Sequence, residues 1–232
     1  MAPALLALGV TLLSVNVNKI ALLRNSRVGK GPEVVPLARL ALEAGAAGIT
    51  VHPRPDQRHI TRHDVEDLTV LLRQPQWRGR EFNIEGNPFE GDWLQIVQQA
   101  RPHQATLVPD TPGQSTSDHG FSMPQDLERL KPVVAQLKGW GCRVSIFMDP
   151  DQAAMRHVPA TGADRVELYT ERYAEAFARR DGDPTVFDAT LRHFVKSATA
   201  AREGGLGVNA GHDLNLANLP VFVEAIGREM LL

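Results

Sequence analysis

The chain has 232 residues, of which 43% are hydrophobic, and it carries a formal net charge of −2. This length and apolar content suit one globular domain with a substantial core, and the slight acidity gives no basis for binding nucleic acid, whose partners usually show a basic excess. Since the single cysteine, Cys142, excludes an internal disulfide and no run reaches the roughly 18 apolar residues of a membrane span, we expect a cytoplasmic protein that does not enter membranes.

Seven short runs of hydrophobic and β-branched residues predict strands. The first, Leu12–Asn18, follows an apolar lead-in that lacks the basic region and the clear cleavage site of a signal peptide, so we expect it to open the fold. The other six strands are predicted near Gly48–His52, Phe82–Glu85, Ala105–Val108, Arg143–Met148, Arg165–Tyr169 and Gly207–Ala210.

Helices are predicted between these strands. Their starts are marked by the capping-box spacing of Thr61 with Asp64 and of Ser122 with Gln125, and by the N-cap and N1 pairs Asp149-Pro150 and Asp183-Pro184. In the helix after Asp183, one apolar stripe contains Phe187, Leu191, Phe194, Val195 and Ala198. Four segments, beginning at Glu43, Lys138, Ala160 and Arg202, end a helix on glycine and pass within a few residues into a strand.

This alternation of strands and helices, without a domain-sized linker, predicts a parallel sheet. Seven such units favour the α/β class and a (β/α)8 TIM barrel, formed as a single domain over residues 1–232. An eighth strand is needed to close the barrel, and an unclosed barrel would expose two strand edges. We therefore expect the natural chain to continue past Leu232 into the eighth strand.

Two connections, Pro109–Ser122 and Thr170–Asp183, are long for links between a strand and a helix, which usually run about two to six residues. The first is polar and rich in turn-forming residues. It is expected to act as a lid that closes over a substrate through Thr116.

Polar residues suited to chemistry end several of the predicted strands. Because the carboxyl ends of parallel strands share one face, His52, Glu85, Glu167 and His212 are expected to converge there. Imidazole, and a carboxyl group whose pKa is raised by burial, can exchange protons near neutral pH. Basic residues also follow the first two strands, although the whole chain is slightly acidic: Lys19, Arg24, Arg27, Arg54 and Arg58. The pattern predicts acid–base chemistry next to a set of cationic side chains.

Long motifs at these strand ends closely resemble the pyridoxine 5′-phosphate synthases. They occur in family order at Leu13–Arg27, Gly48–Ile60, Phe82–Gly86, Arg165–Thr170 and Val208–Leu214. The resemblance implies a (β/α)8 barrel, usually a homo-octamer, in vitamin B6 biosynthesis, and we expect no cofactor and no metal. It also implies the condensation of 1-deoxy-D-xylulose 5-phosphate with 3-amino-2-oxopropyl phosphate, giving pyridoxine 5′-phosphate, phosphate and water.

The resemblance also implies roles for individual residues. His52 and Glu85 match proton acceptors, His212 matches the proton donor, and Glu167 matches a glutamate that stabilises transition-state charge. Asn16 and Arg27 are expected to bind the amino-ketone phosphate, whereas the residues expected to bind deoxyxylulose phosphate are Asn18, Lys19, Arg54, His59 and Thr116.

Some positions depart from the family pattern. Asn18 and Lys19 replace an Asp-His pair found in some members, and Asp213 stands where others have glycine, so only its backbone is expected to bind substrate. Arg24 and Arg58 have no counterpart and are expected on the surface or in salt bridges. The Gly-His pair that follows strand eight in the family has no match in residues 216–232.

Two alternatives compete with this interpretation. A metal-dependent hydrolase would use His52, His59 and His212 as ligands and Glu85 as base, but the strands lack the H-x-H and H-E-x-x-H spacings, and the nearby arginines would repel a cation. A non-catalytic barrel that binds phosphorylated metabolites would need the cations without the four acid–base residues.

Overall fold

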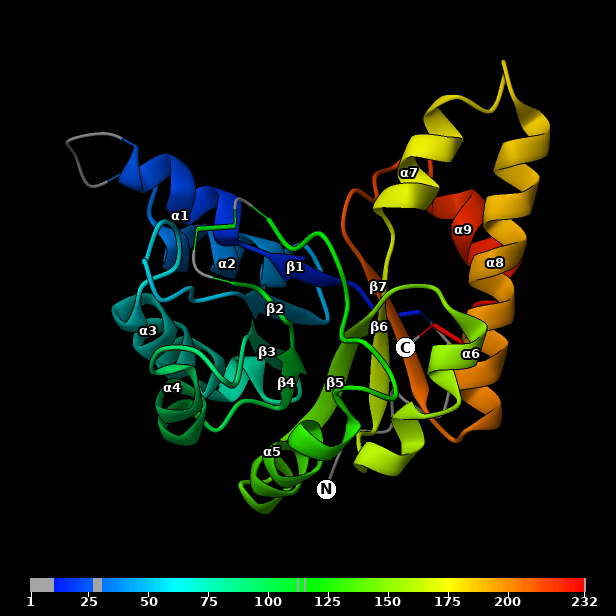
Figure 1. Ribbon diagram of the computed structural model, residues 1–232. Coiled ribbons are helices and arrows are strands. Elements are labelled where there is room, and N and C mark those ends of the chain that lie inside the picture. Colours follow the sequence, from blue (N-terminus) through cyan, green and yellow to red (C-terminus); the bar gives the residue numbers. More distant parts are fainter. Residues whose placement is uncertain (1–10, 27–30, 112, 115, 232) are drawn as a thin grey trace. The chain divides into compact units, whose positions relative to one another are not determined.

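The computed structural model describes residues 11–26, 31–111, 113–114 and 116–231. It contains a seven-stranded parallel sheet in which the strands follow one another in chain order, with helices between them (Figure 1). The strands are β1 (Ser14–Asn16), β2 (Gly48–Val51), β3 (Glu81–Gly86), β4 (Gln104–Leu107), β5 (Arg143–Met148), β6 (Arg165–Tyr169) and β7 (Gly207–Gly211).

All seven predicted strands are confirmed, and β5 and β6 have the predicted bounds. The largest difference is at β1, which ends at Asn16 because Asn18 already begins helix α1 (Asn18–Asn25). The Asn16 Oδ1 atom accepts a hydrogen bond from the Asn18 N–H at 2.9 Å. This local side-chain turn ends the strand, after the Val17 N–H has made one more hydrogen bond to β2, at the Thr50 carbonyl oxygen (3.1 Å).

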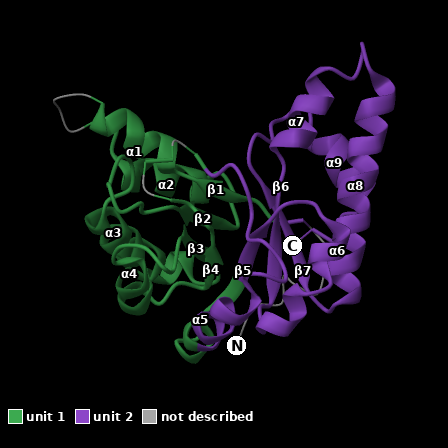
Figure 2. Cartoon of the chain, viewed as in Figure 1, with its two compact units in different colours: residues 1–3, 12–116, 136–144 green, residues 4–11, 117–135, 145–232 purple. Residues whose placement is uncertain are grey.

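The chain divides into two compact units (Figure 2). Among the described residues, the first unit holds residues 12–116 and 136–144, and the second holds residues 117–135 and 145–231 together with Thr11. Helix α5 (Leu127–Gly139) and strand β5 each contribute residues to both units. The single barrel domain over residues 1–232 stays a prediction.

In the first unit, strands β1 to β4 pair in parallel and carry buried side chains such as Ile49, Phe82 and Leu107. The helices of this unit are α1, α2 (Val34–Glu43), α3 (Arg62–Leu72) and α4 (Trp93–Ala100), with a 3-10 turn, η2 (Pro75–Trp77).

The start of α3 confirms the predicted capping box, since Thr61 Oγ1 accepts from the Asp64 N–H and Asp64 Oδ2 accepts from the Thr61 N–H. Asp64 also accepts hydrogen bonds from the Arg24 guanidinium, which confirms Arg24 as a salt-bridge residue.

In the second unit, β6 and β7 pair in parallel and are followed by aromatic-rich helices. The elements are α6 (Gln152–Met155), η3 (Val158–Thr161), α7 (Glu171–Ala178), α8 (Pro184–Glu203) and α9 (Leu219–Ile226). Asp183 caps α8 as predicted by accepting from the Val186 N–H. The predicted stripe on α8 includes the fully buried Phe194, which packs against Tyr173 of α7 and Phe222 of α9.

Positive backbone angles confirm the predicted glycine helix ends. Gly45, Gly141, Gly162 and Gly205 have φ values of 105°, 86°, 83° and 80°. A residue with a Cβ atom is strained in this left-handed conformation, whereas glycine adopts it freely.

Three local predictions are wrong. Ser122 does not cap a helix with Gln125, because α5 begins only at Leu127 and the Ser122 N–H donates instead to the Asp126 carboxylate. The cap of α6 is Asp151, not Asp149, because the Asp151 carboxylate accepts from the N–H groups of Ala153 and Ala154 in the first turn of that helix. The segment Thr170–Asp183 is not an open loop, because α7 occupies most of it.

Two further features concern the ends of strands. Cys142 is buried and lies directly before β5. Leu231 forms an isolated parallel bridge with Val208 of β7, at the place where a following strand would pair. The described residues contain no eighth strand beyond this bridge. None of the helices in these residues combines the length and hydrophobicity that a membrane crossing requires.

Candidate active site

The first group of predicted residues gathers at the ends of β2 and β3. Val51 of β2 pairs with Ile84 of β3, so the next residues, His52 and Glu85, become neighbours. The His52 Nδ1 atom lies 3.9 Å from Glu85 Oε2. The structure therefore places a histidine and a carboxylate of adjacent strands side by side.

The position of Glu85 depends on its neighbour Gly86. A Cβ atom added at Gly86 would collide with the Trp93 ring, so glycine allows Trp93 of α4 to pack closely over the end of β3. From there, Trp93 Nε1 donates a 2.7 Å hydrogen bond to the Glu85 carbonyl oxygen. This contact fixes the backbone from which the Glu85 side chain projects.

His52 is buried, with 6% of its surface exposed. Desolvation lowers the pKa of His52 well below its usual value, and the charges of Arg54 and His59 lower it further. The imidazole is therefore neutral at neutral pH and has one nitrogen able to accept a proton. Its backbone is held by Asn18, whose Oδ1 atom accepts from the His52 N–H at 2.9 Å.

Asp110, which was not predicted from the sequence, completes this group. It follows β4 and is 6% exposed. Its Oδ2 atom lies 3.5 Å from His52 Nε2 and 2.5 Å from Arg54 Nη2. His52 was selected because it stands directly after a strand, whereas Val108 and Pro109 separate Asp110 from the end of β4, which made the signal at Asp110 weaker.

The predicted phosphate-binding residues of the first unit differ in their surroundings. Arg54 is 7% exposed and also donates from Nη1 to the Gln114 carbonyl oxygen at 2.8 Å. Burial, followed by the positive charge of Arg54, lowers the pKa of His59 to about 4. Its ring centroid lies 6.2 Å from that of His52. Asn16, Lys19 and Thr116 are exposed. Arg27 lies outside the described residues.

Arg58 has the alternative role that was expected for it. Its guanidinium pairs with Asp56, with Nη2 and Oδ2 2.5 Å apart. It also donates to the Gln114 carbonyl oxygen at 2.8 Å. Arg58 thus helps Arg54 to hold the segment after β4.

The second group lies at the ends of β6 and β7. Tyr169 pairs with Gly211, so His212 emerges beside the Tyr169 ring, with 5.0 Å between ring centroids and an edge-on angle of 85°. Glu167 faces the same pair of strands, since a Cβ atom added at Gly211 would lie 2.8 Å from Glu167 Oε1. Burial raises the pKa of Glu167 to about 7. The carboxyl group is therefore poised between its two protonation states at neutral pH.

The backbone at His212 is unusual. His212 and Asp213 have φ values of 90° and 56°, which are rare for residues other than glycine. The Thr170 hydroxyl donates to the Gly211 carbonyl oxygen at 2.6 Å and stabilises this turn. His212 Nδ1 lies 2.7 Å from Asp213 Oδ2. The left-handed conformation at Asp213 is one that glycine would adopt without strain.

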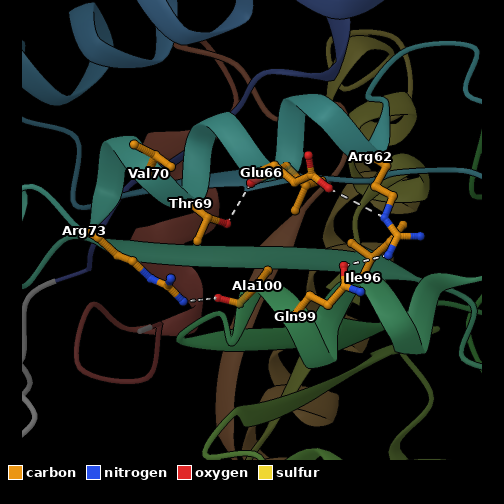
Figure 3. Close-up of a pocket in the computed structure, with 9 residues that line it drawn as sticks. Arg62, Glu66, Thr69, Val70, Arg73, Ile96, Gln99 and Ala100 are labelled. Atoms are coloured by element: carbon orange, nitrogen blue, oxygen red, sulfur yellow. Dashed lines mark hydrogen bonds and ion pairs between the residues drawn. The ribbon is translucent and has the colours of Figure 1, made fainter.

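A surface groove lies apart from these residues, between α3 and α4. It has a volume of about 210 Å³ and is lined by Arg62, Arg73, Glu66 and Gln99 together with apolar side chains (Figure 3). Its polar groups are largely satisfied by one another: Arg62 donates to Gln99 at 2.6 Å, and Arg73 donates to the Ala100 carbonyl oxygen at 3.1 Å. It contains none of the predicted site residues.

The fold and the two groups define the class of protein. Strands and helices alternate around a parallel sheet, and paired histidine and carboxylate residues lie at strand ends, as in acid–base enzymes of the (β/α)8-barrel class. Residues 13–230 match the model of the family described as "Pyridoxal phosphate biosynthesis protein PdxJ". The chain belongs to this family, which confirms the resemblance.

Individual relatives agree with the family match. A pyridoxine 5′-phosphate synthase of Albidiferax ferrireducens is 53% identical over 220 residues, covering 93% of this chain and 84% of the relative. Another, of Xylella fastidiosa, is 49% identical over 222 residues, covering 93% and 82%. Among solved structures, deoxyribose phosphate aldolase from Aeropyrum pernix aligns with a TM-score of 0.58 at 14% identity, covering 96% of this chain and 84% of its own. This likeness supports the predicted (β/α)8 fold class.

Proposed function

We propose that this protein is an enzyme that condenses 1-deoxy-D-xylulose 5-phosphate with 3-amino-2-oxopropyl phosphate to give pyridoxine 5′-phosphate, phosphate and water. The observation that carries the proposal is the group around His52. A buried, neutral imidazole lies 3.9 Å from Glu85, and Arg54 belongs to the same group. A base next to a buried guanidinium suits proton removal from a phosphorylated substrate.

In this proposal, His52 and Glu85 accept protons. Joining an amine to a ketone, eliminating phosphate and closing an aromatic ring each require protons to leave carbon or nitrogen. The lowered pKa of His52 keeps it in the accepting form at neutral pH. The adjacent Glu85 carboxylate is the second acceptor.

His212 donates a proton and Glu167 stabilises charge. What supports these roles is the second group, in which Glu167 has a pKa raised to about 7 and His212 is held against Tyr169. A histidine can carry a proton to a leaving oxygen near neutral pH. A carboxylate in a poorly solvated site stabilises positive charge more strongly than it would in water.

The two phosphates have separate ligands in the proposal. Arg27 and Asn16 bind the amino-ketone phosphate, while deoxyxylulose phosphate is bound by Asn18, Lys19, Arg54, His59 and Thr116. The buried position of Arg54 and the exposed position of Lys19 suit direct and peripheral contacts respectively. The closure of Pro109–Ser122 over the substrate through Thr116 is part of the proposal. We further propose that the protein is cytoplasmic and that it forms a homo-octamer. Light scattering on the purified protein would test the octamer.

The function is tested by turnover of the purified protein with both substrates. We expect formation of pyridoxine 5′-phosphate and release of inorganic phosphate, measured by chromatography and a phosphate assay. Omitting either substrate should abolish both signals. Binding of both substrates without product would instead favour the non-catalytic barrel, and activity that requires an added metal would favour the hydrolase.

Replacing the two arginines should separate the two phosphate sites. Arg27→Ala is expected to raise the KM for the amino-ketone, and Arg54→Ala the KM for deoxyxylulose phosphate. Each loss of a charge-assisted hydrogen bond costs about 1.5–3 kcal/mol, or roughly ten- to a hundredfold in affinity. Arg129→Ala, at an exposed arginine on α5, serves as the control. If both substitutions raised both KM values equally, one shared anion pocket would be the better description.

The left-handed backbone of Asp213 predicts a difference between two substitutions. Asp213→Val should lower the free energy of unfolding by about 1–2 kcal/mol, because a β-branched residue is strained at this φ value. Asp213→Gly should cost less, because glycine adopts this conformation freely. Urea unfolding of the two variants checks this, and equal midpoints for both would contradict it.

A further inference from the structure

We infer that Asp110 is a positioning residue for His52: it holds the imidazole proton on Nε2 and leaves Nδ1, on the Glu85 side, as the nitrogen that accepts a proton. The inference deepens the proposed function and rests on it. Asp110 is assigned no role by the resemblance, and it follows a different strand from His52.

The two ring nitrogen atoms of His52 face different side chains. Each faces a carboxylate, with Nε2 3.5 Å from Asp110 and Nδ1 3.9 Å from Glu85. A neutral imidazole carries only one N–H, and a carboxylate prefers to face that N–H over a lone pair. The two carboxylates therefore compete to select the tautomer.

The anchoring of Asp110 decides between the two tautomers of His52. Asp110 is anchored, because its Oδ2 atom is 2.5 Å from Arg54 Nη2, and Arg54 is in turn held by the Gln114 carbonyl oxygen at 2.8 Å. The guanidinium keeps the Asp110 carboxylate in place and charged. Asp110 is also the nearer partner of His52. It therefore takes the N–H, and the Nδ1 lone pair is available for a substrate proton.

Asp110 also affects the positive charge that forms when His52 is protonated. When His52 accepts a proton at Nδ1, the C–H bond of the substrate breaks, its electron pair stays on the substrate and the imidazole becomes a cation. That cation is disfavoured by burial and by the neighbouring Arg54 and His59. The charged groups that face His52 with the opposite sign are Asp110 and Glu85, and Asn18 contributes only a neutral carboxamide. Asp110 therefore stabilises the protonated base as well as orienting it.

The arrangement also links catalysis to substrate binding. The same Oδ2 atom of Asp110 faces both His52 and Arg54. Arg54 is the residue to which we assign the deoxyxylulose phosphate. A phosphate bound by the Arg54 guanidinium thus changes the electrostatic environment of the Asp110 carboxylate, which orients His52.

The tautomer can be measured directly. In protein labelled with ¹⁵N-histidine, the His52 signals are assigned by their loss in His52→Asn, and their chemical shifts report which nitrogen carries the proton. We expect the Nε2–H form in the unmodified protein. In Asp110→Ala, which removes the acceptor, this preference should be lost. An unchanged tautomer in a folded Asp110→Ala protein would overturn the inference.

Kinetics give a second, independent readout. Asp110→Asn keeps an acceptor oxygen but removes the charge, so kcat should fall about 10- to 100-fold, the range typical of removing an outer partner of a functional histidine. The acidic limb of the kcat/KM profile should move to lower pH, because protonated His52 loses a stabilising charge. Asp110→Glu, which restores the carboxylate, should recover part of the activity.

Controls separate the alternatives. Asp67→Asn, at an exposed aspartate on α3, should leave kcat and the pH profile unchanged. If Asp110 served only to anchor Arg54, Asp110→Asn would raise the KM for deoxyxylulose phosphate and leave kcat and the pH profile unchanged, which would overturn the role at His52. Failure of the proposed function would appear as absent turnover in the unmodified protein, whereas the ¹⁵N measurement needs no turnover.

Discussion

Glu85→Gln is expected to lower turnover by roughly a hundredfold or more while leaving the fold intact, since a positioned general base typically contributes about 10²–10⁴-fold. Glutamine has nearly the same shape as glutamate but cannot accept a proton at neutral pH. The backbone of Glu85 is held through its carbonyl oxygen by Trp93, and the substitution does not touch that contact. The loss should therefore appear in kcat with both substrates saturating, and circular dichroism should remain unchanged.

The matched control for this experiment is Glu66→Gln. Glu66 lies on α3 with a side chain 59% exposed, so the same chemical change there should leave turnover unaltered. Near-normal kcat in Glu85→Gln would remove Glu85 from the proposed acid–base group. A fall in the unfolding temperature comparable to the loss of activity would point to a structural role instead.

Glu167→Gln is expected to lower kcat by about a hundred- to a thousandfold, the cost typical of removing one charge-stabilising group from an active site. Because burial raises the pKa of Glu167 to about 7, the ionised form increases as the pH rises from 6 to 8. Activity that depends on this ionised form should rise over that range in the unmodified protein. The corresponding limb should be absent from the pH profile of the variant.

The contribution of Glu167 to the free energy of unfolding should depend on pH. The unfolded chain ionises Glu167 near its ordinary pKa of 4.5, whereas the folded protein holds the proton until about pH 7. Stability from this group is therefore full below about pH 4.5 and is lost as the pH rises towards 7. Glutamine carries no such dependence, so Glu167→Gln should gain thermal stability over the unmodified protein at pH 8 relative to pH 5. An equal difference at both pH values would contradict the raised pKa.

Sequence patterns located the strands and predicted the glycine ends of α2, α5, α8 and the 3-10 turn η3. β5 and β6 have the predicted bounds, the capping box at Thr61 forms, and the glycine at position 45 is left-handed. These features depend on residues close together in the chain, because strand pattern, cap spacing and glycine conformation are local properties. The family could also be recognised from the sequence, because its motifs are continuous stretches at strand ends.

Local signals misplaced two helix starts. Ser122 with Gln125 has the spacing of a capping box, and Asp149-Pro150 resembles a helix opening, yet α5 and α6 begin later. In both cases another carboxylate, Asp126 or Asp151, forms the hydrogen bonds instead. A short polar motif can form several alternative turns, and tertiary packing selects among them.

The pairing of the charged residues follows from the tertiary structure. The motifs already separated the roles of Arg24 and Arg54, but not their partners: Arg24 is bound to Asp64 and supports α3, whereas Arg54 is buried against Asp110 beside His52. The raised pKa of Glu167 and the lowered pKa of His52 likewise follow from burial. Burial and the pairing of distant side chains depend on long-range packing. Such packing brings Asp110 within 3.5 Å of His52, although the two residues are 58 positions apart in the chain and no local pattern links them.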